Sequence, residues 1–112
     1  MSDKEIVEAA RRFAGIIMDS KTYKEYLDQR EKLKKQPELY ERVNEYRQRS
    51  FDLQNEADGD DIFERMEAFD RDYEELRETP LVDDFLNAEV AFCRMMQEVY
   101  ILLADEIDFE VY

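Results

Sequence analysis

Side chains able to do chemistry are few in this sequence, and one common type is missing altogether. None of the 112 residues is histidine, which removes the most frequent general base and the most frequent metal ligand. The Ser-His and Cys-His nucleophile pairs are excluded for the same reason, as is the Glu-x-x-His pattern of di-iron helix bundles. No histidine-dependent catalysis or metal binding is therefore expected.

The single cysteine, Cys93, is the strongest nucleophile in the sequence. A reactive thiol usually has a cationic or metal neighbour, and the adjacent Arg94 points to a different helical face. Because Phe92, Met95 and Met96 surround it in sequence, we predict that Cys93 is a buried, small apolar residue. A reactive or ligating thiol is the alternative. One cysteine cannot form an internal disulfide, so nothing indicates an oxidising compartment.

The acidic turn 58–61 invites comparison with a calcium-binding loop. An EF-hand places glycine at the sixth position, an acid at the first and glutamate at the twelfth. With Gly59 at the sixth position, Gln54 stands at the first and Arg65 at the twelfth. The turn is therefore interpreted as solvated, and no metal site is predicted.

Carboxylates and glycines likewise give no catalytic pattern. The chain has 30 acidic residues, so neighbouring carboxylates are common, and nothing marks one pair as general acid and base. Gly15 and Gly59 are too far apart to form a phosphate-binding loop. We predict no catalytic, cofactor-binding or metal-binding residue, no cofactor and no small-molecule substrate. The chain is predicted not to be an enzyme.

The elements that would position any site are helices. Two glycines and two prolines leave few of the turns that an all-β protein needs, and residue types that favour helix dominate. Apolar residues at spacings of three and four predict helices over 3–19, 22–35, 37–57, 61–78 and 80–108. We expect one all-α domain over 1–112, an antiparallel bundle of four to five helices with a long C-terminal core helix.

Helix starts carry recognisable capping signals. Thr79-Pro80 combines an N-cap hydroxyl with proline at the first helical position, and Pro37 occupies the equivalent first position of another helix. Three further starts pair a hydroxyl or carboxylate with glutamate three residues later, as in a capping box: Ser2 with Glu5, Thr22 with Glu25, and Asp61 with Glu64.

The helix over 80–108 has more apolar side chains than one face can hold, so it needs burial on several sides. Two compatible explanations are that it is the central core helix and that part of it forms a homodimer interface. Large exposed apolar patches are uncommon on monomers, and seven tyrosines with seven phenylalanines crowd a small core. The candidate self-association surface comprises Phe85, Phe92, Met96, Val99, Tyr100 and Leu103.

Charge is distributed unevenly along the chain. The net charge is −14, but residues 21–49 carry nine basic and six acidic groups, while residues 50–112 carry four basic and 20 acidic groups. So acidic a chain is repelled by nucleic acid and by anionic membrane. The plainer interpretation is that the basic segment packs beside the acidic one, within a chain or between chains. The alternative is a nucleic-acid-associated factor that uses Lys21, Lys24, Arg30, Lys32, Lys34 and Lys35.

No targeting or membrane signal is visible. The first residues are polar and acidic rather than basic and then apolar. The longest uncharged apolar run, Val99 to Ala104, is far short of the roughly 20 residues that span a bilayer. We expect a cytoplasmic protein with no membrane partner.

Three stretches together resemble the YlbF/YmcA-like family of small bacterial regulators, over roughly residues 3 to 110. The segment 20–26 resembles the family's Ser-x-x-Tyr-x-x-Tyr motif, 33–38 resembles a Leu-x-x-Asp-Pro-Glu junction, and 79–89 resembles the C-terminal hallmark. Gln36 replaces the usual aspartate of the junction. The sequence ends at Tyr112 without the cysteine-bearing tail of members associated with an iron–sulfur-containing complex, so it is more similar to the short, YheA-like branch.

The resemblance implies a helical, often dimeric, non-enzymatic regulator. Better-known members are adaptors in a multiprotein complex that affects competence, biofilm and sporulation and tunes the ribonuclease RNase Y. We therefore expect a homodimer that binds protein partners. No specific partner site transfers, because the matched residues are structural.

Overall fold

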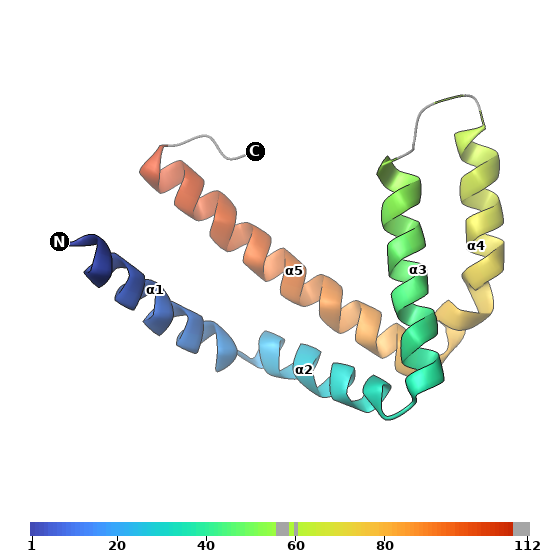
Figure 1. The fold of residues 1–112 in the computed structure, drawn as a ribbon, viewed down its shortest axis with the longest axis horizontal. Helices are drawn as coiled ribbons and strands as arrows, with labels where there is room; N and C mark the ends of the chain where they lie inside the picture. The colour runs from blue at the N-terminus through green and yellow to red at the C-terminus, as the bar shows by residue number, and fades with distance from the viewer. Residues whose placement is uncertain (56–58, 60, 109–112) are drawn as a thin grey trace. The chain divides into compact units, whose positions relative to one another are not determined.

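The computed structural model describes residues 1–55, 59 and 61–108, and within them it contains helices and no strand. The helices are α1 (Asp3–Met18), α2 (Lys21–Lys34), α3 (Pro37–Asn55), α4 (Ile62–Glu78) and α5 (Pro80–Ile107). The predicted all-α fold with a long C-terminal helix is confirmed (Figure 1). Residues 56–57 of the predicted third helix, and Asp58 and Asp60 of the acidic turn, lie outside the described residues.

Two positions adopt left-handed backbone conformations where helices are interrupted. Gly59, between α3 and α4, has a φ of 110°, which glycine adopts without steric cost. Asp108 follows the last residue of α5 with a φ of 56°, and its amide donates to Ala104 O at 3.0 Å. A left-handed residue just beyond the helix is a common way to end one.

The chain divides into two compact units. The first, called here the terminal unit, comprises Met1–Asp28 and Asn87–Tyr112; the second, the hairpin unit, comprises Gln29–Leu86. Helices α2 and α5 each contribute residues to both units. The expectation of a single domain over 1–112 stays a prediction.

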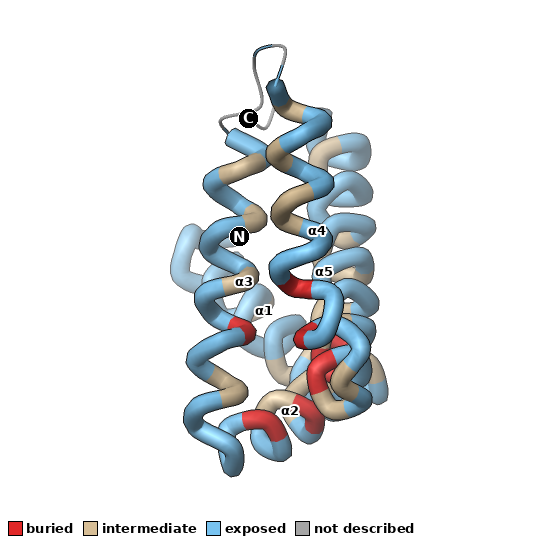
Figure 2. The backbone as a smooth tube through the Cα atoms, turned by 90° about the vertical axis from the view of Figure 1, so that its right-hand side faces the viewer, coloured by how far each residue is buried: buried red, intermediate tan, exposed pale blue. Residues whose placement is uncertain are grey.

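The hairpin unit has the better-formed interior. Its helices α3 and α4 run antiparallel (Figure 1), and Tyr46 of α3 stacks on Tyr73 of α4 with ring centroids 5.2 Å apart. Phe69 completes this cluster, 5.3 Å from the Tyr46 ring. Apolar burial of this kind supplies most of the stability of packed helices. The buried apolar residues of the unit, which Figure 2 colours red, are Leu33, Val43, Tyr73, Leu76, Val82 and Phe85.

A polar network accompanies the aromatic cluster. The Tyr73 hydroxyl accepts a hydrogen bond from Arg49 Nη1 at 2.9 Å and donates one to Glu45 Oε1 at 3.3 Å. The guanidinium carbon of Arg49 also lies 5.3 Å from the Tyr73 ring centroid. The hydrogen bond with Tyr73 is the main cause that raises the pKa of Arg49 above its ordinary value. Tyr73 thus uses both its ring and its hydroxyl to join α3 to α4.

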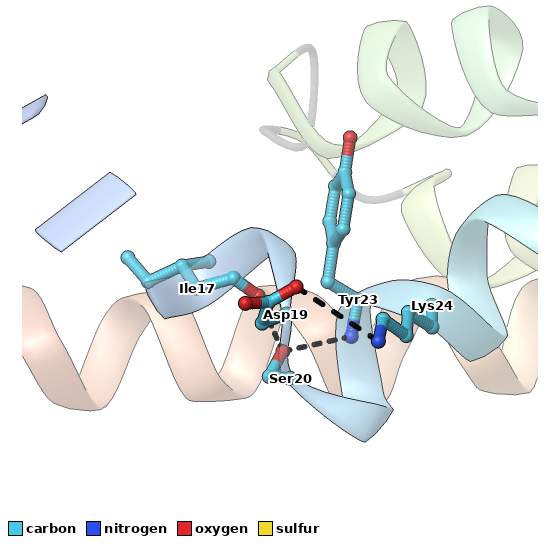
Figure 3. Close-up of polar contacts among 5 residues, drawn as sticks. All are labelled: Ile17, Asp19, Ser20, Tyr23 and Lys24. Carbon is cyan, nitrogen blue, oxygen red and sulfur yellow. Dashed lines mark hydrogen bonds and ion pairs between the residues drawn. The ribbon is translucent and has the colours of Figure 1, made fainter. Parts of the chain in front are cut away.

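The junction between α1 and α2 lies in the terminal unit and is organised by Ser20 (Figure 3). Its hydroxyl donates to Ile17 O at 2.6 Å and accepts from the Tyr23 amide at 3.1 Å. An ion pair between Asp19 and Lys24, 3.9 Å apart, lies across the same junction (Figure 3). Because Ser20 satisfies the amide of the first turn, α2 begins at Lys21, and the prediction that Thr22 starts the helix is wrong.

Of the other predicted helix caps, some form the expected hydrogen bond and some do not. The Ser2 hydroxyl accepts from the Glu5 amide at 3.3 Å, as predicted. Asp61 precedes α4, but its side chain makes no capping hydrogen bond, so that part of the prediction is wrong. At the start of α5 the Thr79 carbonyl accepts from the Asp83 amide at 2.9 Å, and the Thr79 hydroxyl donates to Glu75 O at 3.1 Å. Thr79 therefore bonds both to α4 and to α5.

Replacing the observed and the predicted cap of α2 separates the two assignments. We expect Ser20→Ala to lower the free energy of unfolding by about 1 kcal/mol, because the Tyr23 amide loses its acceptor. Thr22→Ala, two residues away, is the matched control and should change it by less than about 0.5 kcal/mol. Urea denaturation followed by circular dichroism measures both. Equal losses, or a larger loss for Thr22→Ala, would contradict the Ser20 cap.

Candidate functional site

The terminal unit leaves much of its apolar surface uncovered. Helix α1 has no buried residue at all, although it is strongly amphipathic in sequence. Ile6, Phe13 and Ile16 lie within about 80° of one another at 100° per residue, so they form one stripe. The exposed large apolar residues of α1 are Ile6, Val7, Phe13, Ile16 and Met18.

The C-terminal half of α5 shows the same excess. Tyr100, Leu103 and Ile107 lie within about 60° of one another around the helix, and Tyr100 is 60% exposed. A groove of about 690 Å³ follows this half of the helix. The groove is lined by Phe92, Cys93, Met96, Gln97, Tyr100, Ile101 and Ala104. The core-helix interpretation thus suits only the beginning of α5, where Val82 and Phe85 are buried.

The six residues of the candidate self-association surface fall into two groups. Phe85 is 1% exposed and lies 5.6 Å from the Arg47 guanidinium within the hairpin unit, so it does not belong to a surface. Phe92, Met96 and Tyr100 meet in the α5 groove. Val99 is half-buried and Leu103 is exposed on the same stretch of helix. Five of the six residues therefore lie on the C-terminal part of α5, and one lies elsewhere.

An aromatic cluster anchors α2 to α5 inside the terminal unit. The Phe92 ring lies 5.3 Å from that of Tyr23 and 5.4 Å from that of Tyr26, to which it is nearly parallel. Residues three apart on a helix share a face, so both tyrosines reach the same partner. This contact gives the Ser-x-x-Tyr-x-x-Tyr segment a structural meaning: Ser20 begins the helix and the two tyrosines attach it.

Cys93 is exposed, and the prediction that it is buried was wrong. Its neighbour Phe92 contacts the Tyr23 ring of α2, and both Phe92 and Cys93 line the α5 groove. The apolar neighbours in sequence suggested a core position, but α5 has apolar residues on faces that no other described helix covers. A side chain on such a helix can be apolar and still be accessible.

Groups that could do chemistry do not converge within the described residues. No set of three or more Cys, Asp or Glu side chains there is placed to hold a metal ion. A groove of about 380 Å³ in the hairpin unit is lined by two arginines and two aspartates whose charges offset each other: Arg49, Arg65, Asp52 and Asp72, with Leu53, Ala68 and Phe69. Sequence reasoning missed this groove, because its residues come from two helices.

The basic segment is partly neutralised by nearby carboxylates. Lys24 lies 3.9 Å from Asp19. Glu31 lies 3.8 Å from Arg30 and 3.9 Å from Lys34. Lys24, Arg30 and Lys34, which were proposed to contact phosphate, therefore each have an acidic partner. None of the helices in the described part of the chain combines the length and apolar character that a bilayer span requires.

Comparison with known proteins shows which family and which relative the sequence is similar to. The profile of a family described as "Control of competence regulator ComK, YlbF/YmcA" matches residues 6–108. A UPF0342 protein of Caldicellulosiruptor bescii is 19% identical over 113 aligned positions, covering 96% of this chain and 92% of the relative. No solved structure matches the chain.

Removing the Phe92 ring should weaken the terminal unit specifically. We expect Phe92→Ala to lower the free energy of unfolding by about 2 kcal/mol, since both tyrosine contacts and part of the buried area are lost. Phe63→Ala, at an exposed ring of the hairpin unit, is the control and should cost less than about 0.5 kcal/mol. Urea denaturation gives the free energies, and near-ultraviolet circular dichroism reports the tyrosine environment. A tyrosine signal unchanged in Phe92→Ala would contradict the cluster.

Proposed function

This chain belongs to the YlbF/YmcA family, whose profile covers residues 6–108, and from that premise we propose that it is a non-enzymatic regulatory adaptor. In this proposal two copies associate through the terminal unit, and the assembly binds a further protein. The family description names control of the competence regulator ComK. Participation in biofilm formation, sporulation and RNase Y-dependent messenger processing, as the family resemblance implies, is part of the same proposal.

The uncovered apolar surface of the terminal unit is the observation that carries the proposal. Each square ångström of apolar surface removed from water contributes roughly 25 cal/mol, so covering the stripes on α1 and α5 is strongly favourable. Monomeric proteins rarely leave such surfaces open. Helix α1 in particular has no buried residue, and a partner surface would give it an interior.

A second copy of the chain suits this surface for two reasons. Apolar stripes that repeat every three and four residues along two helices are typical of helices that pair with other helices. Residues 1–20 carry three basic and four acidic groups, so two such segments can meet with little charge repulsion. A two-fold interface presents the same patch from both subunits, and the nearly neutral α1 segment permits this along α1.

The nucleic-acid alternative receives less support. Its six cations stand on a chain with a net charge of −14, and Lys24, Arg30 and Lys34 already lie within ion-pair distance of carboxylates. Binding to phosphate would have to replace those contacts. A cytoplasmic location and the lack of a small-molecule substrate complete the adaptor proposal. The single cysteine, which leaves no internal disulfide, supports that location.

The mass in solution tests self-association. We expect size-exclusion chromatography with light scattering to give about twice the 13.6 kDa of one chain at micromolar concentration. Tyr100→Glu combined with Leu103→Glu should give single chains, because two charges would be buried in an apolar interface. Ala91→Glu, at an exposed position of the same helix, is the matched control and should leave the mass unchanged. A wild-type protein of single-chain mass would refute the proposed pairing.

Cys93 provides an independent reporter of the same interface, because it lines the α5 groove. We expect its alkylation by iodoacetamide to be slow in the associated wild type and at least about tenfold faster in the Tyr100→Glu/Leu103→Glu variant. Mass spectrometry of the labelled chain follows the reaction. If both proteins react at the same rate while their masses differ, the interface lies away from the groove.

A further inference from the structure

A second exposed apolar patch lies in the hairpin unit, at the end where α3 finishes and α4 begins. Phe51 of α3 is 61% exposed, and Phe63 and Met66 of α4 are 77% and 48% exposed. These three residues are called here the hairpin patch. They take no part in the aromatic cluster around Tyr73, and the self-association proposed above does not use them.

The rotation of the two helices places the three side chains on one side of the hairpin. Tyr46 and Phe69 mark the inward faces, because their rings meet. At 100° per residue, Phe51 lies about 140° around α3 from Tyr46, and Phe63 about 120° around α4 from Phe69. Since the helices are antiparallel, these two rotations lead to the same side. Met66, rotated by about 60° in the same sense, lies there too.

The groove on the hairpin unit supports this placement independently. Arg49 and Asp72 are each rotated by about 60° in the opposite sense from Tyr46 and Phe69, and both line that groove. The groove therefore occupies one side of the hairpin and the patch the other. Leu53 and Phe69 line the groove together, so Phe51 and Met66, each within one turn of these residues, lie at a similar height along the helices.

The charge around the patch restricts what can cover it. Residues 50–78 contain twelve acidic and three basic side chains, a net charge of −9 over 29 positions. Asp52, Asp72 and Arg65 line the groove on the other side, which leaves ten acidic and two basic side chains in the rest of the segment. A second copy of the same hairpin would bring two such segments together, and like charges oppose that association. Nucleic acid and anionic membrane are disfavoured for the same reason. A suitable occupant has apolar anchors with cationic neighbours.

We propose that the hairpin patch binds a basic amphipathic helix of a partner protein. Its Phe and Met side chains would receive the apolar face of that helix, and lysines or arginines beside that face would meet the surrounding carboxylates. Phe63 and Met66, three residues apart on α4 with Phe51 beside them on α3, offer contacts at the spacing that an amphipathic helix presents. Charge complementarity speeds association and selects partners, while the apolar anchors hold the complex.

This inference gives the partner of the proposed adaptor a chemical class, and in that respect it rests on the proposed function. It does not require self-association, because the hairpin patch and the α5 groove lie in different units. A loss of pairing in the Tyr100→Glu/Leu103→Glu variant therefore leaves the binding of a basic helix intact.

A peptide titration tests the inference on the full chain. The probe is a fluorescein-labelled peptide of about 14 leucines and lysines, roughly four helical turns with one apolar face. A second peptide of the same composition, rearranged to have no apolar face, measures attraction by charge alone. We expect fluorescence anisotropy to show at least about tenfold tighter binding of the amphipathic peptide.

The Phe51→Ser/Phe63→Ser variant should lower the affinity for the amphipathic peptide to that of the rearranged one. Val90→Ser/Leu102→Ser, at two exposed apolar residues of α5 in the terminal unit, is the matched control and should bind the peptide like the wild type. Because both substituted phenylalanines are exposed, the urea denaturation midpoint of the Phe51→Ser/Phe63→Ser variant should match that of the wild type.

Four outcomes would overturn the inference. The two peptides could bind equally well, which would mean attraction by charge alone. The Phe51→Ser/Phe63→Ser variant could keep its affinity, or the control variant could lose as much. Light scattering could instead show that the Phe51→Ser/Phe63→Ser variant no longer self-associates, which would make the hairpin patch a contact between copies of the chain.

Discussion

The structure depends on one constraint: helices in two small units carry more apolar side chains than those units can enclose. In the hairpin unit many apolar side chains are buried, because α3 and α4 pack around the Tyr46, Phe69 and Tyr73 rings. In the terminal unit many stay uncovered, since α1 buries nothing and the second half of α5 is open. Apolar surface left in water is unfavourable. The tendency of this chain to associate therefore depends on which helices leave their apolar side chains uncovered.

The two open surfaces differ in charge, and this difference separates their roles. The α1 segment is nearly neutral, with three basic and four acidic groups in residues 1–20, so a copy of itself can cover it. The hairpin patch lies in a segment with a net charge of −9, where a copy is repelled and a cation is attracted. A protein built in this way can associate with itself at one unit and hold a different partner at the other.

The segments that identify the family are structural rather than chemical. Ser20 stops α1 and starts α2 through two hydrogen bonds, and Tyr23 and Tyr26 fix α2 to Phe92. At the start of α5, Thr79 bonds to residues of both α4 and α5. These residues preserve where helices begin and how they meet. The surfaces proposed to contact partners lie largely outside these segments.

The sequence alone determined the helical fold and placed all five helix starts to within one residue, three of them at the observed residues Asp3, Pro37 and Pro80, because capping and periodicity depend on residues within one or two turns. It could not choose between Ser20 and Thr22, since both hydroxyls suit the same turn. It placed Cys93 in the interior and Phe85 on a surface, and the structure reverses both. Burial depends on which faces of different helices meet, so only the tertiary structure decides it. The arginine groove and the hairpin patch follow the same rule, because each joins residues from two helices far apart in sequence.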